Sequence, residues 1–579
     1  MKKTVICALN AKFIHSSLAI RYLTSFCKKN NISNISMLEF TINDLTDNII
    51  PAIYEEHPDI LCFSCYIWNI DMIHRIASSL KKVSPHTTII FGGPEVSYDA
   101  EELLKHHPYI DCIIRGEGEL TLLELIHAIN EDRPWDSIEG ISYQTSCVPL
   151  STSDRPLIKE LDIIPFPYEN ELASLEDKIV YYETNRGCPF NCSYCLSSTI
   201  KGVRFFSMDR VKKDLLTLMN HRVREIKFVD RSFNCNEKRA MQIMQFILEH
   251  KPQNTFHFEI EPDLLTDSML EYLTTVPPDL FNFEIGIQST FTPTLRAVNR
   301  RGVWEIIKPK IRFLRENTHI HTHLDLIAGL PFESFAQFKT SFNQLFLVHP
   351  HVIQLGFLKL LKGAAIREQP NEHAYLFEDL PPYQILQNQY MTYAELVQLE
   401  RIADLLDRYY NSDLFQMSLT YIINSLYKED AFAFWDDFVT FWNDKKLFAL
   451  GHKRETLYTF LMQFTHIYHP DHINVLNELI KFDFLQKNHK TNLPDAIVSI
   501  NPTNLNEQTY DLIKDESFID QYLPEFIGKS HREVRKCVHM EYFTINPRDT
   551  TMNTDLQPIM FVYDKQKKTP RRIINLEPC

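Results

Sequence analysis

Short apolar runs that alternate with amphipathic segments dominate the first 370 residues of this chain. In residues 1–145 the apolar runs are Thr4–Leu9, Ile35–Phe40, Ile60–Cys65, Thr88–Phe91 and Cys112–Arg115. Strand–helix alternation at this spacing produces a doubly wound parallel sheet, which binds ligands at the carboxyl ends of its strands. We therefore expect a Rossmann-like α/β domain over residues 1–145.

The alternation resumes after a break. Residues 146–175 lack periodicity and contain four prolines, which predicts a connector. Residues 176–370 contain six further strands, near Ile179–Thr184, Glu225–Val229, Thr255–Ile260, Phe281–Ile287, Thr322–Ile327 and Val352–Phe357. Six βα units predict a partial TIM-like (β/α)6 barrel with its chemistry at the carboxyl ends of the strands. Residues 371–579 are expected to be mainly helical, as in Ile385–Tyr410.

Composition excludes several classes of protein. The net charge of −15 argues against a general nucleic-acid binder. No apolar run reaches the roughly 18 residues of a membrane span. The apolar run after Met1 is very short and is followed at once by Lys12 and His15, so a first strand is a better interpretation than a signal peptide. We expect a cytoplasmic protein whose 12 cysteines stay reduced.

Three of the cysteines form a C-x3-C-x2-C motif just after a predicted barrel strand: Cys188, Cys192 and Cys195. Such a loop can bring three thiolates to three irons of one 4Fe–4S cubane and leave the fourth iron open. Zinc sites favour paired C-x2-C units with four ligands, and the sequence has no second pair nearby. Ferredoxins carry a fourth nearby cysteine, which is also absent here.

The motif, with Tyr194 inside it, resembles the radical S-adenosylmethionine superfamily from Ile179 to about Gly363. The resemblance implies that S-adenosylmethionine chelates the open iron, that its cleavage yields a 5′-deoxyadenosyl radical, and that Tyr194 lies beside the adenine. In the pattern of coproporphyrinogen-type members, the further residues implied to contact S-adenosylmethionine are Glu259, Gln288, Arg300 and Asp325. Glu261 competes with Glu259 for this role, and the alternative is that these polar residues only satisfy one another inside the barrel. The family's glycine-rich segment is replaced here by residues 229–233.

An α/β domain in front of such a barrel resembles the cobalamin-binding subfamily, with matches at residues 64–69, 92–95 and 115–119. The resemblance implies cobalamin binding by Gly92, Gly93, Glu95, Gly116, Glu117 and Gly118. The alternative is a Rossmann-like scaffold without a cofactor. The D-x-H-x-x-G motif is absent, so no histidine of that motif ligates cobalt. Cys62 and Cys65 are interpreted as core thiols, and His15 and His74 as structural or surface groups.

The function that this resemblance implies is cobalamin-dependent methyl transfer to an unactivated centre of an unknown substrate, with electrons from a flavodoxin- or ferredoxin-type donor. A radical rearrangement, cyclisation or oxidation without methyl transfer, and a non-catalytic cobalamin or redox sensor, are the alternatives. Residues 371–579 resemble the uncharacterised carboxy-terminal region of one branch of the family. The basic stretch between Arg296 and Arg315 is interpreted as a solvated helix face, with a substrate phosphate or carboxylate as the alternative ligand.

Overall fold

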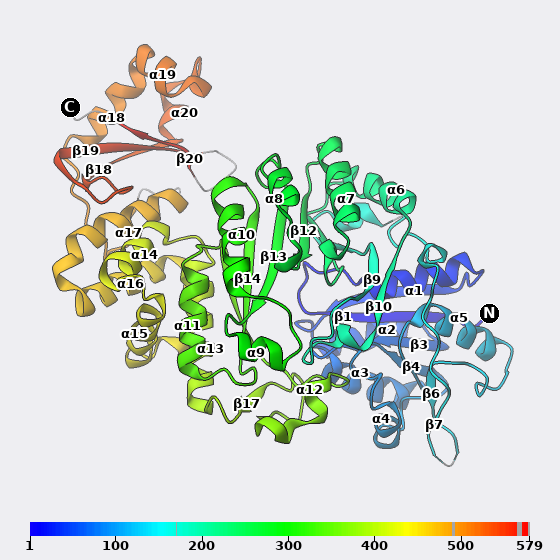
Figure 1. Ribbon diagram of the computed structural model, residues 1–579. Coiled ribbons are helices and arrows are strands. Elements are labelled where there is room, and N and C mark those ends of the chain that lie inside the picture. The colour runs from blue at the N-terminus through cyan, green and yellow to red at the C-terminus, as the bar shows by residue number, and fades with distance from the viewer. Residues whose placement is uncertain (147, 170, 489–491, 564–569, 577–579) are drawn as a thin grey trace. The chain divides into compact units, whose positions relative to one another are not determined.

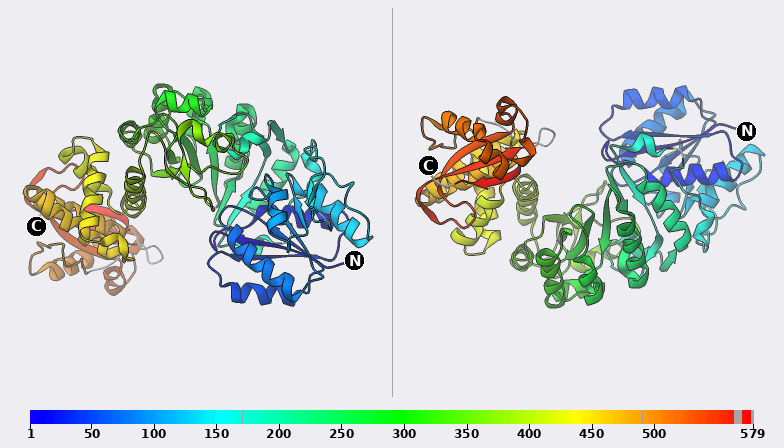
Figure 2. Two further views of the ribbon diagram at one scale, coloured as in Figure 1. Left: turned by 90° about the horizontal axis from the view of Figure 1, so that it is seen from below. Right: turned by 90° about the horizontal axis from the view of Figure 1, so that it is seen from above.

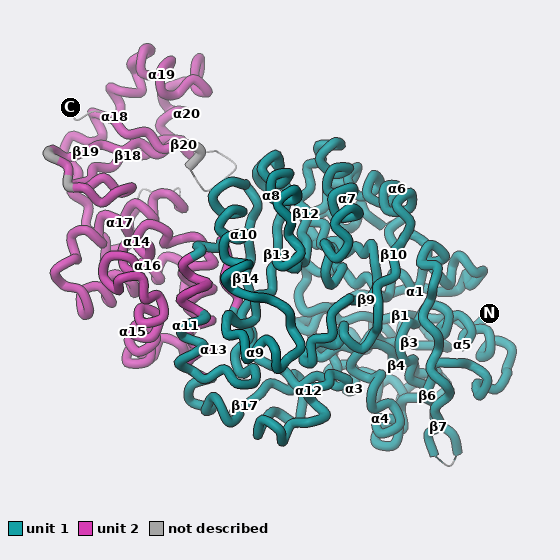
Figure 3. Tube along the Cα trace, viewed as in Figure 1, with its two compact units in different colours: residues 1–341, 348–350, 355–396 teal, residues 342–347, 351–354, 397–579 magenta. Residues whose placement is uncertain are grey.

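The computed structural model describes residues 1–576 except 147, 170, 489–491 and 564–569, and it divides into two compact units (Figure 3). Unit 1 comprises residues 1–341, 348–350 and 355–396. Unit 2 comprises residues 342–347, 351–354 and 397–579. Both predicted α/β parts therefore contribute to one unit.

The amino-terminal part of unit 1 is a seven-stranded sheet of order β2-β1-β3-β4-β5-β6-β7 (Figure 1). Its strands are β1 (Thr4–Asn10), β2 (Ile35–Thr41), β3 (Ile60–Ser64), β4 (Thr88–Gly92), β5 (Cys112–Ile114), β6 (Ile141–Tyr143) and β7 (Leu150–Ser151). Its helices are α1 (Leu18–Lys29), α2 (Thr46–Glu55), α3 (Ile70–Val83), α4 (Ala100–His106) and α5 (Gly118–Asn130). The first five strands are parallel, whereas β6 and β7 add antiparallel at one edge. These two strands were not predicted, because two or three residues are too few to show a periodicity.

Helices on both faces explain the continuous apolar strands of this sheet. Along β1, Val5 and Cys7 join an apolar cluster with residues of α2, α3 and α4, whereas Ile6 joins a second cluster with residues of α1 and α5. Cys62 and Cys65 lie in different clusters, and both are buried and unpaired, which confirms that they are core thiols. Burial raises the pKa of each thiol far above its usual value.

The second part of unit 1 is a six-stranded sheet of order β15-β14-β13-β12-β11-β8, with helices outside it (Figure 1). Its strands are β8 (Ile179–Tyr182), β11 (Glu225–Phe228), β12 (Thr255–Ile260), β13 (Phe281–Gln288), β14 (His321–Ala328) and β15 (Val352–Phe357). The helices between and after them are α6 (Met208–Met219), α7 (Glu237–His250), α8 (Asp267–Leu273), α9 (Thr292–Ala297), α10 (Trp304–Asn317) and α11 (Phe335–Phe346). The predicted fold class, a Rossmann-like sheet followed by a partial barrel, is confirmed.

The barrel strands alternate between two environments. In β13 the buried positions are apolar, beginning with Phe281 and Phe283, and the half-buried positions between them include Glu284 and Gln288. Since alternate side chains of a strand point to opposite faces, one face of the sheet packs under the helices and the other presents polar groups. The candidates Glu259, Gln288 and Asp325 lie at these half-buried positions.

The carboxy-terminal part is mainly helical, as predicted, but it ends in an antiparallel sheet that was not predicted. Its helices are α13 (Tyr393–Leu405), α14 (Gln416–Tyr421), α15 (Ala431–Asp444), α16 (Arg454–Tyr468), α17 (Ile473–Lys487), α18 (Leu505–Lys514), α19 (Glu516–Tyr522) and α20 (His531–Arg535). The sheet strands are β18 (Val538–Ile545), β19 (Met552–Tyr563) and β20 (Pro570–Asn575), and α17 packs beside β18 (Figure 2). The helix predicted from Ile385 begins only at Tyr393, because Ile385–Gln387 forms the short strand β17. Among the helices of the described residues, none combines the length and hydropathy that a membrane crossing requires.

Candidate active site

A small hairpin presents the three cysteines. Strand β9 (Asn185–Cys188) pairs antiparallel with β10 (Gly202–Phe205), and the loop between them contains Cys192 and Cys195. Gly187 has φ of +100°, and a Cβ there would lie 2.1 Å from the carbonyl oxygen of Gly202. Only glycine therefore allows the two strands to approach so closely at the residue before Cys188.

The cysteine loop is partly buried. Cys192 is 6% exposed, and Cys188 and Cys195 are half-buried. The Cys188 Sγ lies 3.7 Å from the Ser232 Oγ. Among the described residues, no group of three or more His, Cys, Asp or Glu side chains is arranged to hold a single metal ion. Thiolates around a cubane each bind a different iron, so the loop fits a cluster rather than one ion.

Arg300 reaches the cysteine loop from the residues after α9. Its Nη2 lies 3.2 Å from the Glu261 Oε2 and donates a hydrogen bond to the carbonyl oxygen of Gly286. Burial opposes its charge, but Tyr194, Glu261 and Cys192 together raise the pKa of the guanidinium. Burial raises the pKa of Glu261 to about 7, against the lowering effect of Arg300. The structure thus brings Tyr194, Cys192 and Arg300 together, and it pairs Arg300 with Glu261 rather than Glu259.

Gln288 ends β13 at an irregularity in the pairing with β14. Its φ is +67°, and its buried Oε1 has no hydrogen-bond partner among the described residues. A Cβ on Gly286 would lie 2.2 Å from the Gln288 Nε2, so this side chain folds back over Gly286. A buried amide oxygen without a partner costs stability, and a bound ligand would satisfy it.

Glu259 and Asp325 belong to a different group on the same polar face. Burial raises the pKa of both carboxyls, and nearby Glu284 raises that of Asp325 further. The Asp325 Oδ1 lies 3.3 Å from the His323 Nε2 and has no hydrogen-bond partner among the described residues. Both carboxyls therefore lie in a polar layer that favours their neutral forms.

The ion pairs of this polar layer were not predicted from the sequence. The Glu284 Oε2 lies 2.7 Å from the Lys227 Nζ and 2.9 Å from the His257 Nε2, and the His257 Nδ1 lies 3.1 Å from the Glu225 Oε1. These residues alternate with buried aromatic residues along β11, β12 and β13. The alternation of charged and aromatic residues was the signal that could have revealed the layer.

Two predicted cobalamin-binding glycines have different surroundings. Gly93 has φ of +115°, and a Cβ there would lie 2.5 Å from the carbonyl oxygen of Cys65, so the fold itself requires this glycine. Gly116 has φ of +77°, and a Cβ there would meet no atom within 4 Å. Open space in front of Gly116, at the carboxyl end of β5, fits a ligand that approaches the backbone.

The predicted cobalamin-binding carboxylates have protein partners in the structure. Glu117 lies 2.7 Å from Arg204 and 3.3 Å from Arg186, and Arg186 also pairs with Glu119 at 2.6 Å and Glu183 at 2.9 Å. Glu95 lies 3.2 Å from the Lys362 Nζ and accepts a hydrogen bond from the Tyr383 hydroxyl. These contacts join the amino-terminal sheet to the cysteine hairpin and to the segment after the barrel. Glu95 and Glu117 therefore have ion-pair or hydrogen-bond partners within the protein itself.

The basic stretch of α10 and its preceding loop does not form one face. Lys310 donates to the carbonyl oxygens of Pro262 and Asp263, and Arg301 lies over the Phe190 ring at 5.9 Å. Arg300 belongs to the cysteine site. The stretch is thus divided among separate contacts.

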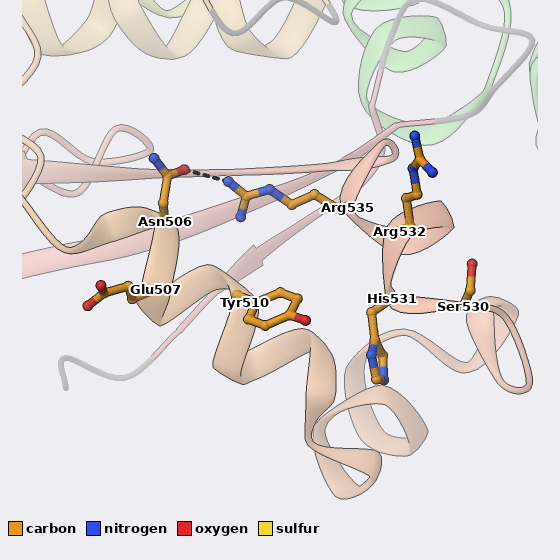
Figure 4. A pocket seen from close by; sticks show the side chains of 7 residues that line it. All are labelled: Asn506, Glu507, Tyr510, Ser530, His531, Arg532 and Arg535. Atoms are coloured by element: carbon orange, nitrogen blue, oxygen red, sulfur yellow. Dashed lines mark hydrogen bonds between the residues drawn. The ribbon is translucent and has the colours of Figure 1, made fainter.

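One hollow of unit 2 is lined by no predicted site residue (Figure 4). Its volume is about 630 Å³, and its lining residues are Asn506, Glu507, Tyr510, Ser530, His531, Arg532 and Arg535. The predicted residues all belong to unit 1, so this hollow is not part of the predicted site.

Three families match successive parts of the chain. Residues 4–126 match the family described as B12 binding domain, and residues 182–345 match the radical SAM superfamily. Residues 371–561 match a protein family of unknown function, DUF4080.

Known proteins match the first two parts. The cobalamin-dependent radical SAM methyltransferase TokK of Streptomyces tokunonensis is 26% identical over 340 residues, 55% of this chain and 49% of that protein. An anaerobic magnesium-protoporphyrin IX monomethyl ester cyclase of Rubrivivax gelatinosus is 25% identical over 333 residues, 54% of this chain and 59% of that protein. The chain thus spans about half the length of these curated relatives.

The fold matches that of a solved structure, the cobalamin-dependent S-adenosylmethionine radical enzyme OxsB with aqua-cobalamin and S-adenosylmethionine bound. The TM-score is 0.60 at 14% identity, over 84% of each chain. Together with the family matches, this fold confirms the predicted resemblance. The chain belongs to the radical SAM proteins that carry an amino-terminal B12-binding domain, in a form with a carboxy-terminal DUF4080 region.

Proposed function

We propose that this chain is an enzyme that binds a 4Fe–4S cluster, S-adenosylmethionine and cobalamin, and transfers a methyl group to an unactivated centre of a substrate. The observation that carries the proposal is the position of the cysteine hairpin within unit 1. It lies beside the barrel residues Arg300 and Ser232 and against Glu117, at the ligand-binding edge of the B12-binding sheet. When bound, the three groups supply a 5′-deoxyadenosyl radical and a transferable methyl group.

The residues of the site fit these groups. Cys188, Cys192 and Cys195 would ligate three irons. Arg300 would pair with the carboxylate of S-adenosylmethionine through N–H groups other than those that contact Gly286, and the buried Gln288 Oε1 would gain a partner. The open space at Gly116 would admit part of cobalamin.

Reduction of the cluster requires an external electron, so a flavodoxin- or ferredoxin-type protein is the proposed donor. A cytoplasmic location is proposed because every cysteine that the structure describes is a free thiol, as expected in a reducing compartment.

The central experiment measures two products. The full chain, reconstituted anaerobically with iron, sulfide and hydroxocobalamin, should release 5′-deoxyadenosine from S-adenosylmethionine under reduction. With methyl-labelled S-adenosylmethionine, label should enter the product of a candidate substrate. Release of 5′-deoxyadenosine with unlabelled product would favour the non-methylating alternative, which the similarity to a cyclase supports. A full cluster without any 5′-deoxyadenosine would favour the sensor.

Arg300→Ala or Asp325→Ala should weaken the binding of S-adenosylmethionine by about one to two powers of ten. Loss of Arg300 removes a charge-assisted hydrogen bond of roughly 1.5–3 kcal/mol, and loss of Asp325 leaves a ribose hydroxyl without its partner at a cost of about 1–3 kcal/mol. Anaerobic equilibrium dialysis measures this affinity, and the iron content should stay at the wild-type level. Arg312→Ala is the control, since this arginine of α10 is exposed, whereas Arg300 is held at the cysteine loop. Loss of iron in both variants would mark the two residues as structural.

Gly116→Leu should weaken the binding of hydroxocobalamin to the full chain by about tenfold or more, because the new side chain enters the open space at the sheet edge. Equilibrium dialysis measures the affinity. Thermal unfolding should shift to a lower temperature because φ of +77° disfavours any side chain, and Gly116→Ala is the control that has this strain without filling the open space. Gly93→Ala is the contrasting variant, since its Cβ would collide with the Cys65 carbonyl and lower the stability of the fold. Wild-type affinity in Gly116→Leu would remove this loop from the proposed site.

A further inference from the structure

The segment that follows the barrel has no role assigned by the proposed function. This bridging segment, residues 358–388, follows β15 and contains α12 (Ala365–Glu368), β16 (Leu376–Phe377) and β17, and Figure 1 shows its course. It belongs to unit 1, although its residues from 371 onward lie in the DUF4080 match. The family of unknown function therefore begins inside the same compact unit as the cysteine hairpin.

One end of the bridging segment holds the cysteine loop. The Ile366 amide donates a hydrogen bond of 3.0 Å to the carbonyl oxygen of Ser193, which lies between Cys192 and Cys195. The Ser193 amide donates a bond of 3.0 Å to the carbonyl oxygen of Val298. Both main-chain polar groups of Ser193 are thus used, one by the barrel and one by the bridging segment, so a shift of this segment moves the loop.

The bridging segment also contacts the B12-binding domain. The Lys362 Nζ lies 3.2 Å from the Glu95 Oε1 and 2.8 Å from the Asp99 Oδ2. The Tyr383 hydroxyl donates to the same Glu95 oxygen. Glu95 is only 5% exposed, and a buried carboxylate needs such partners to remain charged. It follows Gly93 at the carboxyl end of β4, on the edge where a sheet of this type binds its ligand.

The segment and this edge also fit closely in shape. Gly363 has φ of +83°, and a Cβ there would lie 2.4 Å from the ring of Tyr98. The Tyr98 hydroxyl lies 3.1 Å from the Thr199 Oγ1, four residues after Cys195. The amide of Leu360 donates to the carbonyl oxygen of Tyr383 at 3.0 Å, which ties the two halves of the segment together.

We infer that Lys362 and Tyr383 are positioning residues, which hold the β4–α4 loop of the B12-binding domain at a fixed distance from the cysteine loop. They act through Glu95 on one side and through the Ile366–Ser193 hydrogen bond on the other. The bridging segment thus sets the separation of the two cofactor sites, and Tyr383 gives the start of the DUF4080 region a part in this role. This role rests on the proposed function, because it concerns the two cofactor sites. The contacts of Lys362 and Tyr383 can nevertheless be tested without cofactors.

The first measurement is hydrogen–deuterium exchange of the full chain without cofactors. Lys362→Met and Tyr383→Phe each remove one contact with Glu95. We expect faster exchange of the amides in residues 93–99 and also in residues 193–199, although the contacts of Lys362 and Tyr383 described above are with Glu95 and Asp99 and not with Ser193. Lys359→Met is the matched control, because Lys359 is an exposed lysine on the same segment. Lys362→Arg should restore most of the protection.

The second measurement is the affinity of the cluster-loaded full chain for hydroxocobalamin. In the Lys362→Met and Tyr383→Phe double variant, we expect affinity to fall about tenfold with unchanged iron content, because a loosened loop must be ordered on binding. The inference is supported only if both the hydrogen–deuterium exchange and the affinity for hydroxocobalamin change as expected. Wild-type exchange in residues 193–199, or faster exchange throughout the chain, would overturn the inference, as would unchanged affinity. Failure of the wild-type chain to bind hydroxocobalamin would instead contradict the proposed function, and the exchange result would still stand.

Discussion

Simultaneous replacement of Cys188, Cys192 and Cys195 by alanine should abolish the iron–sulfur absorbance of the anaerobically reconstituted protein. The wild-type chain should bind about four irons in one cubane, because three thiolates from one loop can each bind a different iron. Iron analysis and visible absorbance measure the effect, and the release of 5′-deoxyadenosine should disappear with the cluster.

Cys235→Ala is the control that makes this result specific. Cys235 is a half-buried free thiol whose pKa is raised to about 11, chiefly by burial and further by Asp230 and Cys188. It is therefore a neighbouring cysteine outside the motif. Retention of the cluster in Cys235→Ala and its loss in the triple variant are expected. A full cluster in the triple variant, or its loss in Cys235→Ala, would contradict the ligand assignment.

Arg186→Met should lower the free energy of unfolding of unit 1 by about 3–5 kcal/mol, because it leaves buried carboxylates without a partner. The guanidinium contacts Glu117, Glu119 and Glu183, and all four side chains are at most 14% exposed. Urea unfolding followed by circular dichroism measures the change, and the iron content should fall as well, because Arg186 lies two residues before Cys188.

The control for this prediction is Arg133→Met. Arg133 pairs with Glu131 at 2.6 Å, but both side chains are more than half exposed, at 51% and 55%. An exposed pair contributes about 1 kcal/mol or less. Equal effects of the two substitutions would show that the ion pairs between hairpin and sheet do not stabilise the unit.

Periodicity was sufficient to predict both α/β parts of the fold, because the order of apolar and polar residues within strands such as β1 and β13 already shows which positions are buried. It could not predict the partners of Glu117, which lie 69 and 87 residues away in the chain. The cysteines could be predicted directly from the motif, since its spacing is local.

Gly93 and Gly116 look alike in sequence, and only the position of the Cys65 carbonyl separates a glycine required by the fold from one that faces open space. The antiparallel sheet β18–β20 was missed because its pairing joins segments on either side of a turn in a region interpreted as helical.

The burial of thiols in this fold has a consequence for cluster assembly. Among the described residues, the cysteines that are not buried are Cys188, Cys195 and Cys235, and all three lie in the barrel. Burial raises the pKa of Cys27 to about 12 and that of Cys112 still further above its usual value. Iron binds thiolates, so the protonated core thiols do not compete for it. Among the cysteines that the structure describes, incoming iron therefore meets accessible sulfur only in this part of the barrel.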